Sequence, residues 1–304
     1  MGFQEVKRVA EEYQKNSKAP LAFGFKDLQT GESIYYHGDE PFPTASQYKM
    51  FILAELFRKA YTGECSLSDR YCLTDSIKSG GSGVLDLMKE GLNLTLNDWA
   101  TLMMILSDNT ATNFLFEFTG RDNIKKNVID ALGLKNTKCD WNCSDLLDIT
   151  YECRDIGFKA MYAKPVSERP SYHMSKYYAC TTEENDQSSP MDSAKLLELL
   201  YTGKWVCPEA SKGMLDIMKE CQTNSRIPKF LPDGVEVAHK TGSLDRLNVD
   251  CGIVFTPDHG DYILCLYYNG NLSSKEDYDN NPHGSVGDEY LAELSRDIYK
   301  AFIK

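Results

Sequence analysis

A serine and a lysine three residues apart stand near the start of the chain, in Ser46-Gln47-Tyr48-Lys49. On a helix, residues at this spacing lie on the same face, so the Ser46 hydroxyl and the Lys49 amine are expected to be neighbours. A serine hydroxyl attacks an acyl carbon only if a base takes its proton, and a lysine whose pKa is lowered by burial can do so at neutral pH. The pair predicts a nucleophile and its base, although this spacing alone also occurs in many helices where both residues are solvated.

Two further groups of residues fit the same chemistry. Ser107-Asp108-Asn109 ends an apolar helical stretch, and Lys240-Thr241-Gly242-Ser243 ends a predicted strand. Each group is ordinary by itself, because such residues are frequent at helix ends and in turns. Together the three groups give the order S-x-x-K, S-D-N and K-T-G, each in the kind of element that this acyl-transfer chemistry uses.

At these motifs the sequence resembles the penicillin-recognising serine enzymes, and most closely the class A β-lactamases. The likeness continues around the motifs in Gly81-Ser82-Gly83-Val84-Leu85, in Thr110-Ala111-Thr112-Asn113 and in Asp250-Cys251-Gly252-Ile253-Val254. It runs from the first predicted helix to the last. The resemblance implies a β-lactamase/transpeptidase-like fold, antibiotic resistance as a biological role, a small-molecule β-lactam or acyl-D-amino-acid-like substrate, and no metal or organic cofactor.

The resemblance also implies catalytic roles for four positions. Ser46 would be the acylated nucleophile, and Lys49 would be its general base or proton relay. Ser107 would pass a proton toward the leaving nitrogen. Lys240 would supply positive charge near a substrate carboxylate. The implied reaction is acyl transfer through a covalent ester on Ser46.

The resemblance also implies substrate-binding roles for residues close to Ser107 and Lys240. Asn109 would hold the substrate's side-chain amide, and the hydroxyls of Thr241 and Ser243 would bind the carboxylate. The backbone N–H groups of Ser46 and Ser243 would form the oxyanion hole, where each donor is worth roughly 2.7–4 kcal/mol. Gly242 fits because a side chain there would crowd a substrate that lies along the strand.

The sequence departs from the family at the step that removes the acyl group. Class A enzymes carry a glutamate in an E-x-x-x-N pattern before a helix that begins with Thr-Pro, and this glutamate activates the attacking water. Here the helix begins at Ser189-Pro190, and no such pattern precedes it at the family's distance. Glu168 is the nearest candidate for a deacylation base, and a solvated loop carboxylate is the alternative. An apparent insertion between Asp140 and Ser188 predicts a remodelled loop over the site.

Two charged neighbours of the third motif have open roles. The arginine that often supports carboxylate binding on the next strand is missing, and Asp250 stands in its place. Arg246 either substitutes for that arginine or is only a turn residue. His239 either tunes Lys240 or points away from the site.

The elements that must position these residues follow from hydrophobic periodicity. A helix opens the chain, a second helix enters at Thr44 with one buried stripe, residues 60–225 look helical throughout, and a last helix covers about 287–302. Alternating β-branched and aromatic residues predict strands at 21–26, 33–37, 235–239, 249–255 and 262–268. This order predicts an α+β fold with three α/β/α layers, in which both chain ends form a five-stranded antiparallel sheet.

The predicted sheet subdomain comprises residues 1–60 and 226–304, and the all-helical lobe comprises residues 61–225. The lobe contains the atypical insertion, at about 139–190, which is expected to hold long loops. The residues that select the natural substrate are expected to lie in this insertion.

Composition narrows the class of protein. The 304 residues include 33 Lys and Arg against 45 Asp and Glu, a net charge of −12, which disfavours nucleic-acid binding. No run approaches the ~18 apolar residues of a membrane span, and the charged first twenty residues do not resemble a signal peptide.

Ten cysteines without regular spacing favour the cytoplasm, with secretion as the alternative. A monomer is expected, and zinc ligation by Cys139, Cys143, Cys153 and His173 is disfavoured.

Overall fold

The computed structural model of the chain describes residues 2–168, 184–272 and 286–304. Its centre is an antiparallel five-stranded sheet in the order β2-β1-β9-β8-β7, so the two ends of the chain build one sheet as predicted. Its strands are β1 (Leu21–Asp27), β2 (Ser33–Tyr36), β7 (Glu236–Leu244), β8 (Leu247–Phe255) and β9 (Tyr262–Asn269). The K-T-G residues lie within β7 and not after it, because β7 continues to a tight turn into β8.

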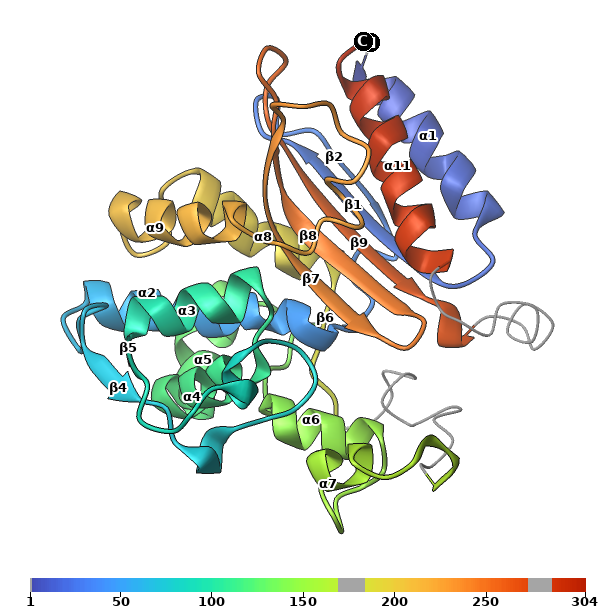
Figure 1. Cartoon of the computed structure of the whole chain (residues 1–304). Helices are drawn as coiled ribbons and strands as arrows, with labels where there is room; N and C mark the ends of the chain where they lie inside the picture. The colour runs from blue at the N-terminus through green and yellow to red at the C-terminus, as the bar shows by residue number, and fades with distance from the viewer. Residues whose placement is uncertain (1, 169–183, 273–285) are drawn as a thin grey trace.

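Two helices from opposite ends of the chain cover one face of the sheet (Figure 1). They are α1 (Gly2–Asn16) and α11 (Val286–Phe302). Apolar residues of both helices pack against outward-facing aromatic and aliphatic residues of β1 and β9, and the partly buried ring of Phe302 packs on the buried rings of Phe25 and Tyr262. Burial of apolar residues between helices and sheet is the main stabilising contribution here.

The other face of the sheet is covered by α8 (Pro190–Tyr201), α9 (Pro208–Lys219) and the helix of the first motif (Figure 1). Both α8 and α9 begin with proline at a position where its missing N–H costs nothing, and the side chains of Ser189 and Cys207 cap their first turns. This face carries the larger of the two main hydrophobic cores.

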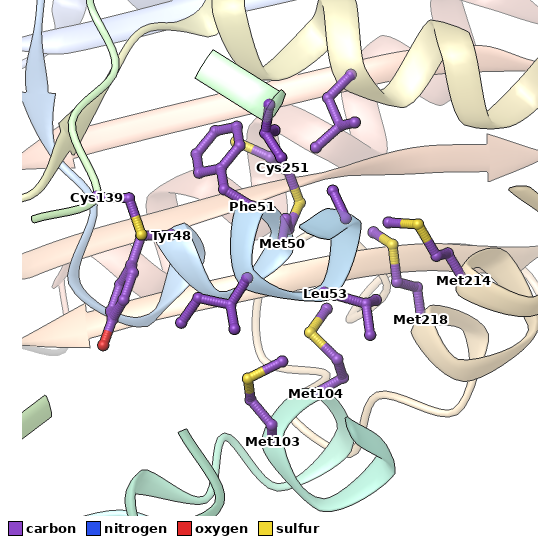
Figure 2. Packing of buried hydrophobic residues seen from close by; sticks show 14 of the residues in the cluster. Tyr48, Met50, Phe51, Leu53, Met103, Met104, Cys139, Met214, Met218 and Cys251 are labelled. Atoms are coloured by element: carbon purple, nitrogen blue, oxygen red, sulfur yellow. The ribbon is translucent and has the colours of Figure 1, made fainter. Parts of the chain in front are cut away.

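The helix of the first motif, α2 (Lys49–Tyr61), is more deeply buried than its periodicity predicts. Every residue from Lys49 to Phe57 is buried, whereas the sequence indicates a single apolar stripe. The reason is its position between the sheet, α3 and α9, where Met103, Met104, Met214 and Met218 surround it (Figure 2). The helix is preceded by a 3-10 turn, η1 (Ala45–Tyr48), so regular α-helix starts at Lys49 and not at Thr44.

The middle of the chain is mostly helical, with two small strand pairs that the sequence pattern does not indicate. Its helices include α3 (Leu96–Ile105), α4 (Asn109–Thr119), α5 (Arg121–Ile124) and the π-helical η4 (Lys125–Asp130). The strand pairs are β4 (Arg70–Cys72) with β5 (Asn93–Thr95), and β3 (Phe42–Pro43) with β6 (Gln187–Ser188). Single 3-10 turns are η2 (Asp75–Ile77), η3 (Leu85–Leu87) and η7 (Gly270–Leu272). Strands of two or three residues are too short to give a period, so the prediction of a helical pattern throughout 60–225 is wrong at these positions.

The segment expected to hold long loops begins with two short helices. They are α6 (Cys143–Thr150) and α7 (Phe158–Tyr162), followed by the 3-10 turn η5 (Val166–Glu168). Asn142 caps α6 by accepting a hydrogen bond from the backbone N–H of Asp145. Helices of five to eight residues present too few turns for a helical period to stand out in the sequence.

Two further findings concern the helices and the cysteines of the described residues. No helix in residues 2–168, 184–272 and 286–304 is both long and apolar enough to cross a bilayer. The nine cysteines within those ranges are all free thiols. The division into a sheet subdomain and a helical lobe stays a prediction.

Candidate active site

The first motif lies on a strained turn that faces the sheet edge. Ser46 is the second residue of η1 and is half-buried, and the preceding Ala45 has a φ of 44°, which is costly for a residue with a side chain. A Cβ at Gly242 would overlap the carbonyl oxygen of Thr44. Gly242 is therefore needed so that β7 can lie against the turn that carries Ser46, a different reason from the substrate crowding that the sequence indicates.

Lys49 is fully buried, and oxygen atoms of the second motif satisfy its amine. Lys49 Nζ donates to the backbone oxygen of Ser107 at 2.8 Å, to Ser107 Oγ at 3.2 Å and to Asn109 Oδ1 at 2.9 Å. Ser107 lies between α3 and α4 with a φ of 55°, which turns its carbonyl and hydroxyl toward the lysine. The structure thus brings the first and second motifs into direct contact.

Lys240 reaches the same serine from the sheet. Its Nζ donates to Ser107 Oγ at 3.2 Å and to the backbone oxygen of Thr241 at 2.9 Å, and the side chain is fully buried. One serine hydroxyl therefore accepts hydrogen bonds from two lysines that lie 191 positions apart in the sequence (240 − 49 = 191). All three motifs converge at Ser107.

The pKa values of the Lys49 and Lys240 side chains are both lowered. Burial lowers the pKa of Lys49, and the charge of Asp108 and the contact with Cys143 oppose this effect only in part. Burial also lowers the pKa of Lys240, to about 7; the nearby Cys221 and Asp250 oppose this effect, whereas the positive charges of Lys49 and Arg226 add to it. Lys240 can therefore hold or release a proton near neutral pH, and the neutral form of Lys49 is favoured by burial.

Asp108 stabilises the loop and the helix start that lie on the side of the site opposite the sheet. Its carboxylate accepts hydrogen bonds from the backbone N–H groups of Val84 at 2.6 Å, Leu85 at 2.9 Å and Ala111 at 2.9 Å, so it caps α4 and holds the preceding loop together. Gly83 has a φ of 106°, and a Cβ there would overlap the Asp108 carboxylate. This contact explains the glycine in the loop before the second motif.

Arg226 is a site residue that the motifs do not reveal. Its buried guanidinium donates to the backbone oxygen of Gly242 at 3.0 Å, to the backbone oxygen of Val249 at 2.7 Å and to Ser243 Oγ at 2.5 Å. Arg246, for which the sequence left open a substitute for the missing arginine or only a turn residue, lies in the turn between β7 and β8 with a φ of 56°. Arg226 comes from the segment before β7, outside every motif, so no sequence signal marks it.

A cavity of about 280 Å³ opens over Ser46. Ser46, Asn109 and the exposed Ser243 line its polar side. The opposite wall comes from the atypical segment through α6 and α7, and its residues are Leu146, Leu147, Thr150, Tyr151, Phe158 and Tyr162. The remodelled segment therefore forms one side of the candidate site, with a mainly apolar surface.

Cys143 also lines this cavity, although its sequence context suggests no role there. Its thiol lies 3.2 Å from Asn109 Oδ1 and 3.2 Å from the Tyr48 hydroxyl, and it hydrogen-bonds Lys49. The backbone N–H of Cys143 donates to Asn113 Oδ1 at 3.0 Å, so the start of α6 is held against α4. Only the tertiary contact brings this thiol beside Lys49.

Three other residues that the sequence singles out, Glu168, Thr241 and His239, do not line the cavity over Ser46. Glu168 is exposed at the end of η5 and is not one of the residues that line the cavity, and Thr241 is buried beside Lys240. His239 points to Asp250, with Nδ1 and Oδ1 2.8 Å apart. The part of the chain that the structure describes contains no cluster of three metal-ligating side chains, and His173 lies outside it.

The chain is similar to known proteins in sequence and in fold. A model of the beta-lactamase enzyme family matches residues 3–302. Beta-lactamase CARB-4 of Pseudomonas aeruginosa is 28% identical over 138 residues, which are 45% of this chain and 48% of that protein. The match therefore spans about half the length of the Pseudomonas relatives.

Two solved structures share the architecture over nearly their whole length. The beta-lactamase from Sphaerobacter thermophilus has a TM-score of 0.75 at 24% identity, covering 99% of this chain and 97% of that chain. The structure of PBP-A has a TM-score of 0.75 at 23% identity, covering 98% and 96%. At these identities the likeness shows the fold, and it confirms the β-lactamase-like fold that the motifs predict.

Mutation of Asp108 tests whether its hydrogen bonds hold the loop before the second motif. We expect Asp108→Ala to lower the free energy of unfolding by about 3 kcal/mol or more, because three backbone N–H groups lose a charged acceptor. Chemical denaturation measures this change, and Asp122→Ala, which removes an exposed carboxylate on α5, is the matched control. A loss below about 1 kcal/mol would show that the loop holds itself without Asp108.

Proposed function

We propose that this chain, which belongs to the beta-lactamase enzyme family, is a serine acyl hydrolase that opens β-lactam amides through an acyl-enzyme on Ser46. The observation that carries the proposal is the convergence of Lys49 and Lys240 on Ser107 Oγ, next to the cavity that Ser46 lines. Membership in this family supports a hydrolase that acts on small-molecule β-lactams. The steps below are inferred from this chain's own residues.

Acylation starts with proton transfer from Ser46 to a base. Lys49 lies three residues after Ser46, and burial lowers its pKa, which favours the neutral amine that can act as a base. The Ser46 oxygen then attacks the substrate carbonyl carbon. The backbone N–H groups of Ser46 and Ser243 are the proposed donors to the oxyanion that forms.

Ser107 is the proposed route for the proton that the leaving nitrogen needs. When the C–N bond breaks, Ser107 Oγ gives its proton to nitrogen and receives one from Lys49 or Lys240, both within 3.2 Å. The proton taken from Ser46 can return in this way through Lys49, so acylation needs no net proton from solvent. A single hydroxyl between two amines is suited to such a relay.

An anionic group of the substrate is proposed to bind at the β7 edge. Lys240 supplies charge there, the hydroxyls of Thr241 and Ser243 supply hydrogen bonds, and Asn109 holds the substrate amide. Arg226 is ion-paired with Asp288 at 2.5 Å, so its proposed contribution is to orient the Ser243 hydroxyl through its 2.5 Å contact. The pairing of Arg226 with Ser243 supports the proposal that this chain replaces the missing strand arginine from a different segment.

Deacylation is proposed to be slow. Among the described residues that line the cavity there is neither an aspartate nor a glutamate, and Glu168 is exposed outside the cavity. Water attack on the Ser46 ester therefore depends on Lys49, or on Glu168 if that carboxylate acts as the base. General-base assistance is typically worth 10²–10⁴-fold, so the difference is large enough to measure.

The same lack of a lining carboxylate favours a second candidate function. A D-Ala-D-Ala peptidase, or another amide or ester hydrolase of this fold, would use the same acylation step without rapid hydrolysis of penicillin adducts. A β-lactam receptor that is acylated once ranks last. Turnover of a chromogenic cephalosporin against turnover of a D-Ala-D-Ala peptide separates these functions. A monomer in the cytoplasm, with secretion as the alternative, stays a prediction.

Replacement of the nucleophile is the first test. We expect Ser46→Ala to abolish the mass adduct with benzylpenicillin and all acyl transfer, because the Ser46 oxygen forms the covalent bond. Thermal unfolding is expected to be nearly unchanged, since the buried residues of α2 hold the helix. Ser82→Ala, at another hydroxyl that lines the cavity, is the matched control and should keep the adduct. An adduct that persists in Ser46→Ala would disprove the assignment.

The charge of Lys240 gives a test by pH. Because the pKa of Lys240 is about 7, its positive charge is present below that pH and is lost above it. We expect kcat/KM for an anionic substrate, divided by that for a neutral ester with the same acyl group, to fall as the pH rises through about 7. Lys240→Arg should flatten this ratio, and Lys240→Ala should lower it by roughly 10- to 100-fold. Equal losses for both substrates would remove the proposed role.

The proposed slow step is tested with rapid-quench mass spectrometry at saturating benzylpenicillin. We expect more than half of the protein to carry the Ser46 acyl group in the steady state, because water attack lacks a carboxylate in the cavity. A small acylated fraction with fast turnover would contradict this expectation. In that case Glu168→Gln, compared with the loop control Glu184→Gln, shows whether Glu168 is the base.

A further inference from the structure

A second cluster of titratable side chains lies at the sheet edge and takes no part in the proposed reaction. It consists of Cys221, which follows α9, His239 on β7 and Asp250 on β8, and all three side chains are buried. His239 Nδ1 lies 2.8 Å from Asp250 Oδ1. The thiol of Cys221 hydrogen-bonds the His239 ring. The order thiol, imidazole, carboxylate is the arrangement that activates a cysteine as a nucleophile.

The surroundings favour the charged form of this pair. Burial raises the pKa of the Cys221 thiol, but the hydrogen bond and charge of His239, the charge of Lys240 and the backbone N–H of Thr223 outweigh it, so the net shift is downward. Burial lowers the pKa of His239, but Asp250 and Cys221 outweigh this effect and raise it to about 10. Asn224 Oδ1, 3.3 Å from Nε2, adds an uncharged acceptor. An imidazolium is thus held between a carboxylate and a thiol.

The thiol also borders a cavity that is separate from the one over Ser46. This cavity has a volume of about 590 Å³, and Cys221, Asn224 and Pro228 are among its lining residues. The lysines at its rim are paired with acids, Lys219 with Glu236 at 2.7 Å and Lys212 with Asp216 at 2.6 Å. Glu220 also lines the cavity, so its two lysines and three acids sum to 2 − 3 = −1, a net charge that repels anions but not an uncharged small molecule.

We propose that Cys221, activated by His239 and Asp250, is a second nucleophilic site of this protein, at which small neutral disulfides form a mixed disulfide. The Cys221 sulfur attacks one sulfur of the reagent, the reagent's S–S bond breaks, and a new S–S bond joins Cys221 to half of the reagent. The other half leaves as a thiolate and takes a proton from solvent. The protein thiol is oxidised and the reagent is reduced by the same two electrons. Ser46 takes no part, so this covalent step does not need the proposed acyl transfer, although Cys221 and Lys240 affect each other's pKa.

The test is site-resolved labelling of the full chain with dithiodipyridine, a small neutral disulfide. Timed samples are quenched in acid, and the modified cysteines are identified by peptide mass spectrometry. Cys72 is the internal reference, because it is exposed on β4 whereas Cys221 is buried. We expect Cys221 to react about tenfold faster than Cys72 at neutral pH in spite of its burial. A Cys221 that stays unmodified, or that reacts more slowly than Cys72, would overturn the proposal.

A variant of His239 and a pH series test whether His239 causes the fast labelling expected of Cys221. His239→Gln should slow labelling of Cys221 about tenfold and leave Cys72 unchanged, while His259→Gln, in an exposed turn, should change neither. If His239→Gln does not fold, the unaltered protein still decides the question. Its ratio of Cys221 to Cys72 labelling should rise as the pH is lowered from about 8.5 to about 6.5, because an ordinary thiol loses its thiolate in that range. A constant ratio would contradict a thiolate stabilised by His239.

Discussion

The hydroxyl of Ser107 accepts hydrogen bonds from Lys49 and from Lys240, and the rest of the site depends on this shared contact. A buried amine without hydrogen-bond partners is costly, so each lysine must find oxygen atoms inside the protein. Lys49 finds them on the loop between α3 and α4, and Lys240 finds one at Ser107 Oγ of the same loop and one at the backbone oxygen of Thr241 on its own strand. The need to satisfy two buried amines therefore fixes the helices against the edge strand.

This constraint also accounts for the strained residues around the site. Ala45 and Ser107 both have positive φ angles, which cost energy in residues with a side chain. Their neighbours hold them in place: Gly242 lets β7 lie against the turn that carries Ser46, and Asp108 holds the loop on the other side. The stability of the packed core around α2 maintains a geometry that the local sequence alone would not adopt.

The apolar side of the cavity over Ser46 comes from a different part of the chain than its polar side. Ser46 lies on the short turn η1 before the deeply buried α2, whereas α6 and α7 supply an apolar wall from short helices. The rings of Tyr151 and Phe158 are tilted against each other, with centroids 4.8 Å apart, in a small cluster separate from the main cores. Leu146 and Cys143 of the same wall belong to the main core that contains α2. Changes at Tyr151 and Phe158 are therefore expected to disturb Lys49 less than changes at Cys143.

The sequence by itself determined the features that depend on local pattern. The five strands and both terminal helices follow from hydrophobic periodicity, and the three motifs follow from residue type and order. Tertiary structure alone decided which residues from unrelated segments meet: Arg226 at Ser243, and Cys143 beside Lys49. It also decided the downward pKa shifts of Lys49 and Lys240, because burial and distant charges set them. Such contacts join positions far apart along the chain, and no local period or spacing records them.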